Sequence, residues 1–173
     1  METYYVEASA DDGTSGTNAN TDGDYLVAMN NQSITPALVS FGWAFINTNG
    51  IPVAATITAA TLHWYHHSYT LSGRGNTYHR QIILSEPGGG SILDSSATPP
   101  AAGWHSVALD SIRFPAINRT GKTEFRFTVN EPASGMSRLW NVRSWDYGDS
   151  NEFAAYLEVE FSLGGRRYRV MVT

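Results

Sequence analysis

The side chains of this chain best suited to acid–base or metal chemistry are its five histidines and the acids of its turn-rich segments. Three histidines lie in the run His63-Trp64-Tyr65-His66-His67. An extended strand would place His63, Tyr65 and His67 on one face and the other two residues on the opposite face. Zinc needs a third convergent protein ligand, and the chain has neither a cysteine nor an HExxH pair to supply one. We therefore interpret the run as a polar strand face and expect no metal there.

Six aspartates lie in segments rich in Gly, Asn and Ser, where paired carboxylates of a glycosidase or the oxygen ligands of a calcium ion could sit: Asp11, Asp12, Asp22, Asp24, Asp146 and Asp149. Asp and Gly are also ordinary turn residues, and the full EF-hand pattern is absent. No GxSxG elbow, P-loop or dinucleotide fingerprint is present. We therefore expect a protein that is not an enzyme and needs no cofactor, with loop calcium as the open alternative.

Aromatic residues beside loops could bind a sugar, because an exposed indole face stacks on a sugar ring. The segment WNVRSWDYGDSNE combines aromatic and polar side chains in one stretch, and Trp104 lies beside another loop. The alternative for these tryptophans is burial in the core or in a subunit interface. If a glycan platform exists, we expect it to comprise five residues: Trp140, Arg143, Trp145, Asp146 and Tyr147.

The elements that would position these residues are strands, and the clearest pattern lies between Phe41 and Tyr65. Phe41, Trp43 and Phe45 alternate with smaller residues, which predicts a strand with one heavily apolar face. Asn and Gly in the following NTNG quartet favour a reversal, and Pro52 biases the residue before it toward extended geometry. A second β-prone run follows, so we predict two long strands that flank an Ile-Pro corner.

Period-two patterns elsewhere predict about ten strands and no amphipathic helix, which indicates an all-β fold in a single domain, residues 1–173. We expect one buried face in the run of Tyr25, Val27 and Met29 and another in the run of Phe125, Phe127 and Val129. Gly164 and Gly165 predict a tight turn in a C-terminal hairpin, whereas GGGS at 88–91 and TPPAAG at 98–103 are interpreted as loops or bulged connections. The predicted strands are Tyr4–Ala8, Tyr25–Met29, Phe41–Phe45, Ile57–Leu62, Tyr78–Leu84, Trp104–Leu109, Phe125–Val129, Arg138–Val142, Phe153–Phe161 and Tyr168–Val172.

The charge of the chain argues against nucleic acid as a partner. The 173 residues include 16 acids and 11 Lys or Arg, for a formal net charge of −5, whereas binding to a phosphate backbone depends on clustered cations. The N-terminal METYYVEASADD has no basic segment followed by an apolar run, and no stretch is long enough to span a membrane. We therefore expect a soluble protein without a secretion signal.

Three short motifs resemble those of jelly-roll β-sandwiches of the DNRLRE-like and carbohydrate-binding-module-like kind. They are the early Asp11-Asp12-Gly13, the Ile-Pro corner from Ile51 to Leu62, and the terminal run from Ala155 to Val159. Such modules occur as non-catalytic domains of bacterial surface proteins and, in close variants, as virion proteins of tailed phages. The resemblance implies a single antiparallel jelly-roll β-sandwich.

That resemblance also implies a role, which we state as an expectation: a phage virion structural protein, in head decoration or in a tail or fibre, made in the host cytoplasm. Its partners would be other virion subunits, including copies of itself, and a cell-surface polysaccharide is the alternative partner. Edge strands offer unpaired backbone groups to a neighbour, so we expect assembly contacts near both chain ends, at Tyr4, Tyr5, Arg167, Tyr168 and Arg169.

Overall fold

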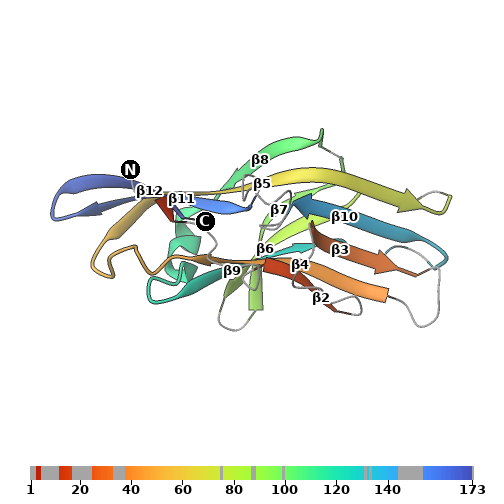
Figure 1. The fold of residues 1–173 in the computed structure, drawn as a ribbon, viewed down its shortest axis with the longest axis horizontal. Coiled ribbons are helices and arrows are strands. Elements are labelled where there is room, and N and C mark those ends of the chain that lie inside the picture. The colour runs from red at the N-terminus through yellow and green to blue at the C-terminus, as the bar shows by residue number, and fades with distance from the viewer. Residues whose placement is uncertain are drawn as a thin grey trace.

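The computed structural model describes residues 3–4, 12–16, 25–32, 38–74, 76–86, 89–98, 100–130, 132, 134–143 and 154–172, and most of these residues form strands (Figure 1). A short 3₁₀ helix, Ser111–Ala116, precedes β9. The strands are β1 (Thr3–Tyr4), β2 (Asp12–Gly16), β3 (Tyr25–Asn31), β4 (Leu38–Asn47), β5 (Thr56–Ser72), β6 (Arg80–Glu86), β7 (Gly89–Ser96), β8 (Gly103–Ala108), β9 (Lys122–Thr128), β10 (Ser137–Arg143), β11 (Tyr156–Leu163) and β12 (Arg166–Val172).

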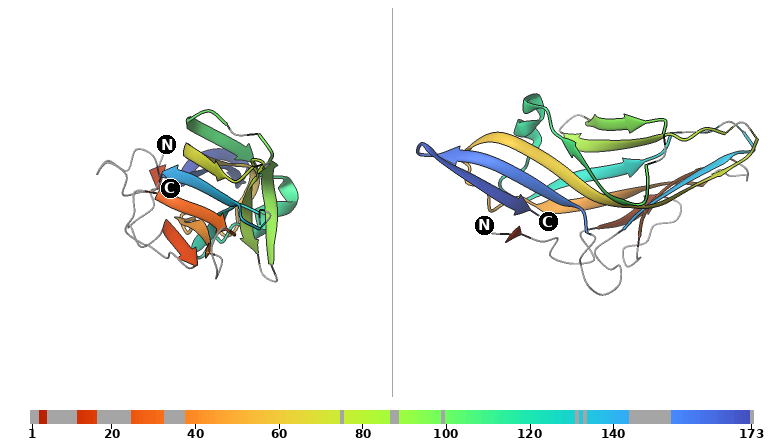
Figure 2. Two further views of the ribbon diagram at one scale, coloured as in Figure 1. Left: turned by 90° about the vertical axis from the view of Figure 1, so that its right-hand side faces the viewer. Right: turned by 90° about the horizontal axis from the view of Figure 1, so that it is seen from above.

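The described strands form one hydrogen-bonded sheet in the order β1-β12-β11-β5-β10-β3-β4-β9-β6-β7, with β2 added to β4 and β8 to β5. Every pairing is antiparallel except that of β1 with β12. The sheet curls back on itself (Figure 2). The rings of Trp140 and Phe127 show this, because they lie 5.6 Å apart although β10 and β9 are not hydrogen-bonded neighbours. The all-β prediction is confirmed, in the form of a curled antiparallel sheet that encloses its own core.

Strand β5 is 17 residues long and changes partner along its length. Its first half pairs with β11 from Thr56 to His63, and its second half pairs with β10 from His66 to Ser72. Strand β8 pairs with the middle of β5, from Thr61 to His66. The candidate site lies at this junction of β5, β8, β10 and β11.

The predicted Ile-Pro corner does connect two long strands, β4 and β5, which pair with different partners. Ile51 is buried, and the amide of Ala55 donates to the carbonyl of Pro52 at 2.9 Å. Arg119 donates to the carbonyl of Ala55 at 2.5 Å, so a loop between the 3₁₀ helix and β9 holds the corner. The predicted C-terminal hairpin is also present, with Gly164 and Gly165 both at positive φ.

The phase of burial in β3 differs from the sequence prediction. Among residues 28–31 of β3 the buried ones are Ala28 and Asn30 rather than Met29. Among residues 39–47 of β4 the buried ones are Ser40, Gly42, Ala44, Ile46 and Asn47. The aromatic face of β4, formed by Phe41, Trp43 and Phe45, is half-buried on the outside of the sheet.

Cross-strand register explains this inversion. Ala28 lies opposite Trp140, Gly42 opposite Phe127, and Ala44 opposite Phe125. Directly opposed residues share one face of a sheet, and the three large rings are fully buried. These rings fill the interior around them, so the positions directly opposite have room only for small side chains.

Two strands were missed by the sequence analysis. Asp12 and Gly13, interpreted as turn residues, belong to β2 and pair with β4. Gly89 to Ser91, interpreted as a loop or bulged connection, begin β7, which pairs with β6 across a register shift at Ile82 and Ile83. Weak local propensity is overridden here by pairing with a neighbour. Residues 5–8 of the first predicted strand lie outside the described residues.

Candidate functional site

The strands β8, β5 and β11 bring four rings together on the outer face of the sheet. Tyr65 is the direct cross-strand partner of Trp104, and His63 is the partner of Tyr156. Alternation along β5 points its buried residues, including Trp64, into the core and these two outward. We call this surface the outer aromatic face, and it comprises His63, Tyr65, Trp104, Arg143, Tyr156 and Glu158.

Trp104 is the most accessible ring of this face, with 43% of the residue exposed. Its centroid lies 5.7 Å from that of Tyr65 at 85° and 5.5 Å from that of Tyr156 at 65°. Tyr156 in turn stacks on His63 at 4.4 Å with nearly parallel planes. Edge-to-face and stacked contacts of this kind are favourable, so the neighbouring rings fix the orientation of the exposed indole.

Charged and polar groups border the rings. The guanidinium carbon of Arg143 lies 4.3 Å from the centroid of Tyr65. The Oε1 atom of Glu158 accepts hydrogen bonds from Nε of Arg169, at 2.5 Å, and from its Nη2. The other oxygen, Oε2, lies 3.8 Å from Nε2 of His63. The face therefore combines an apolar plane with groups that can exchange hydrogen bonds with a ligand.

The ionisation states of His63 and Tyr156 follow from their burial. Desolvation lowers the pKa of His63, although the Glu158 carboxylate opposes this effect. Desolvation also raises the pKa of Tyr156, with the same carboxylate adding to the shift. Both rings are therefore neutral at pH 7, and both can act as hydrogen-bonding partners without carrying charge.

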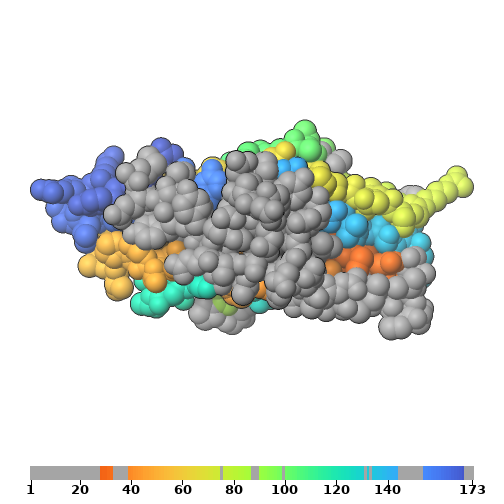
Figure 3. All heavy atoms as spheres, viewed as in Figure 1, coloured from red at the N-terminus to blue at the C-terminus, as the bar shows by residue number. Residues whose placement is uncertain are grey.

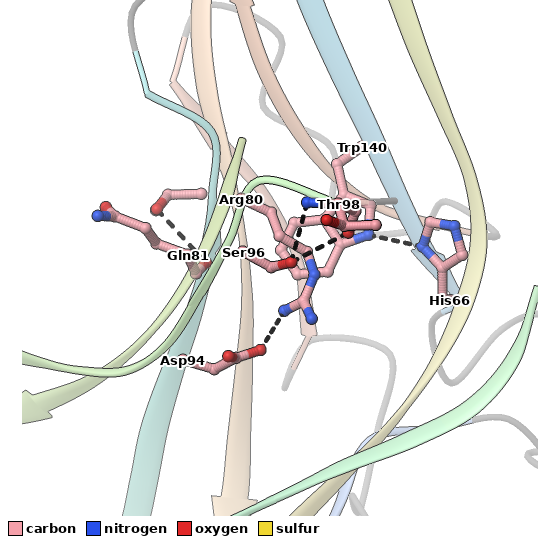
Figure 4. A network of polar contacts seen from close by, with 8 residues as sticks. His66, Arg80, Gln81, Asp94, Ser96, Thr98 and Trp140 are labelled. Carbon is pink, nitrogen blue, oxygen red and sulfur yellow. Dashed lines mark hydrogen bonds and ion pairs between the residues drawn. The ribbon is translucent and has the colours of Figure 1, made fainter. Parts of the chain in front are cut away.

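Trp140 lies in the core, so the prediction that it forms part of a glycan platform is wrong. Its exposed fraction is 0%, and its Nε1 donates to Nδ1 of His66 at 3.0 Å (Figure 4). Arg80 lies against the rings of Trp64 and Trp140, 5.4 Å from each, and forms an ion pair with Asp94. In β10 alternation turns Trp140 inward and Arg143 outward, which is why only one of these two reaches the outer face.

The remaining platform residues, Trp145, Asp146 and Tyr147, lie outside the described residues. Of the six candidate aspartates, Asp12 lies in β2. The other five lie outside the described residues. Among the residues that the structure describes, no three His, Cys, Asp or Glu side chains are grouped as a metal site would require. The described part also contains no helix long and apolar enough to cross a bilayer.

Four of the five expected assembly residues belong to described strands, β1 and β12. Tyr4 pairs with Val172 through its backbone, whereas Tyr5 is outside the described residues. Arg167 is exposed, and Tyr168 is 42% exposed while its ring stacks on Phe161 at 5.3 Å. The hairpin of β11 and β12 that carries them projects at one end of the elongated molecule, drawn in blue in Figures 1 and 3.

The sequence analysis placed Trp104 beside a loop but did not group it with Tyr65, His63 and Tyr156. The available signal was alternation, which correctly put His63 and Tyr65 on one strand face. The pairing of β8 and β11 with the middle and first half of β5 could not be read from spacing. No model of a known protein family matches the chain, and no curated protein matches it.

Proposed function

We propose that this chain is a non-enzymatic carbohydrate-binding module that attaches to a cell-surface glycan through the outer aromatic face. The observation that carries the proposal is the exposed indole of Trp104, held edge-on by Tyr65 and Tyr156. An oriented aromatic plane offers dispersion contact to the apolar face of a sugar ring. Glu158, His63 and Arg143 at its border would bind the hydroxyl groups. In keeping with this role, we assign the curled sheet to the jelly-roll β-sandwiches.

Replacing Trp104 with alanine should lower retention on the cognate glycan tenfold or more, because truncation of an aromatic anchor removes roughly 2 kcal/mol of binding energy. Immobilised lipopolysaccharide, capsular polysaccharide and peptidoglycan are the probes, and the dissociation constant is the measurement. Ile112→Ala is the matched control, since Ile112 is a 73% exposed apolar side chain on the 3₁₀ helix. Retention that is equal in the Trp104→Ala variant and the wild type would refute the role of this face.

A second candidate function is a structural subunit of a phage virion, either a head decoration or a component of the tail or fibre. The observation that favours it is the projecting β11–β12 hairpin, where Arg166, Arg167 and Tyr168 are exposed. Residues Arg166 to Val170 have no strand partner on the outer edge of β12 among the described residues. An open edge beside an exposed ring can accept a strand or side chains from a sibling subunit.

The double variant Arg167→Glu and Tyr168→Ala should shift an assembled species toward monomer, because it reverses a charge and removes a ring at the contact. Sedimentation velocity measures the mass distribution over a range of concentrations. The Trp104→Ala variant is the control and should assemble as the wild type does. The structural role would be refuted if the wild-type protein stays monomeric at all concentrations and also remains unbound when virion particles are added.

A further inference from the structure

A groove opens on the outside of the opposite part of the sheet, over β4, β6 and β9 and beside the 3₁₀ helix. Its volume is about 740 Å³, within the range of roughly 300–1,000 Å³ that small-molecule sites occupy. None of its lining residues belongs to the outer aromatic face, which lies on β5, β8, β10 and β11. The lining residues used below are Phe45, Ser85, Glu86, Lys122, Glu124 and Arg126.

An aromatic stripe on β4 leads into this groove. Phe45 lines the groove, and its ring centroid lies 5.0 Å from that of Trp43. Two residues further back, the ring of Phe41 lies 5.2 Å from the guanidinium carbon of Arg126, another lining residue. These three rings are half-buried on the outer side of β4, since the alternate residues Ser40, Gly42, Ala44 and Ile46 occupy its core face. The stripe supplies apolar surface along the approach to the groove and at its wall.

The charges in the groove are already compensated. Arg126 donates from Nε to Oε1 of Glu124 at 2.7 Å and from Nη2 to Oε2 at 3.3 Å. Glu86 lies 3.5 Å from Nη1 of Arg113. Arg113 lies outside the lining, so the lining residues alone carry no net charge: Glu86 and Glu124 are equal in number to Lys122 and Arg126. The lining itself therefore offers a charged ligand no excess of opposite charge.

The same pairs leave hydrogen-bonding capacity for a neutral ligand. A carboxylate has about four lone-pair sites, and the bidentate contact with Arg126 uses one on each oxygen of Glu124. Because the guanidinium also holds the carboxylate in one orientation, the free sites point in fixed directions. The Ser85 hydroxyl adds a group that can both donate and accept.

We propose that this groove is a second, independent binding site, and that it binds a neutral oligosaccharide. Phe45 contacts the apolar face of a sugar ring, and Glu124 accepts hydrogen bonds from its hydroxyl groups. The aromatic stripe lets further sugar residues extend along β4. A chain with both sites would attach to a polysaccharide at two points on opposite parts of the sheet, which strengthens attachment through a high effective concentration.

The test uses the full chain carrying Trp104→Ala, so that the outer aromatic face does not contribute. Cellohexaose, xylohexaose and maltohexaose are the neutral probes, and hexagalacturonate is the charged comparison. Calorimetry measures affinity, and amide chemical shifts report which strands respond. We expect at least one neutral hexasaccharide to bind more tightly than hexagalacturonate and to shift amides of β4 and β9.

Phe45→Ala and Glu124→Gln, each added to this background, should lower the affinity tenfold or more. Glu124→Gln preserves size, so it tests the carboxylate even if Phe45→Ala folds poorly. Glu160→Gln is the matched control, because this carboxylate also lies near an arginine, Arg169, but outside the groove; it should leave the affinity unchanged. The proposal is overturned if no neutral hexasaccharide binds, if hexagalacturonate binds more tightly, or if binding survives both groove substitutions.

Discussion

Replacing Trp140 with alanine is expected to lower the free energy of unfolding by about 3–5 kcal/mol, the usual cost of truncating a buried tryptophan. The ring is fully buried, lies 5.6 Å from Phe127 and supports the guanidinium of Arg80. Its removal leaves a cavity and also deprives His66 of the donor to its Nδ1. Urea unfolding followed by circular dichroism measures the change, and the melting temperature should fall by roughly 10 °C.

Two further variants separate the causes of this loss. Trp140→Phe keeps an aromatic ring beside Phe127 but has no N–H, so it should cost roughly 1–3 kcal/mol, the penalty for leaving a buried acceptor unpaired. Trp104→Ala makes the same truncation on the outer face and should cost under about 1 kcal/mol, since exposed positions tolerate substitution. Equal destabilisation by Trp140→Ala and Trp104→Ala would contradict the assignment of one to the core and the other to the surface.

The fold class, the corner between β4 and β5 and the C-terminal hairpin could be predicted from the sequence because each has a local cause. Alternation specifies a strand, Pro52 restricts its own backbone, and Gly164 and Gly165 tolerate positive φ. The inward face of β4 could not be predicted in the same way. Gly42 and Ala44 on that face are small because Phe127 and Phe125 lie opposite them, and that register is a property of two strands.

The candidate site was harder to predict for the same reason. Trp140 and Arg143 are three residues apart in one strand, so they must point to opposite faces, yet the sequence analysis placed them in one platform. Trp104 was recognised as lying beside a loop, but its partners on β5 and β11 are about 40 and 50 residues away in the chain. Spacing within a strand is local information, whereas a surface made from four strands depends on long-range pairing.

The buried histidine of the core should make stability depend on pH. His66 is 3% exposed, and its Nδ1 must be unprotonated to accept from Trp140. Burial lowers its pKa from 6.5 to about 4, and the positive charges of His105, Arg80 and His67 add to this effect. Between these two pH values the unfolded chain binds a proton on His66 that the folded protein does not bind.

The stabilisation associated with neutral His66 is therefore complete above about pH 6.5 and is lost progressively as the pH falls toward 4. A shift of this size corresponds to about 3 kcal/mol, measured as the difference in unfolding free energy between pH 7 and pH 4.

His63 and His79 also have lowered pKa values and add to the dependence of stability on pH, so the comparison must be made between variants. His66→Asn can still accept from Trp140 but cannot titrate, and its curve should be flatter than that of the wild type by most of this amount. Parallel curves for the wild type and His66→Asn would exclude His66 as the group responsible.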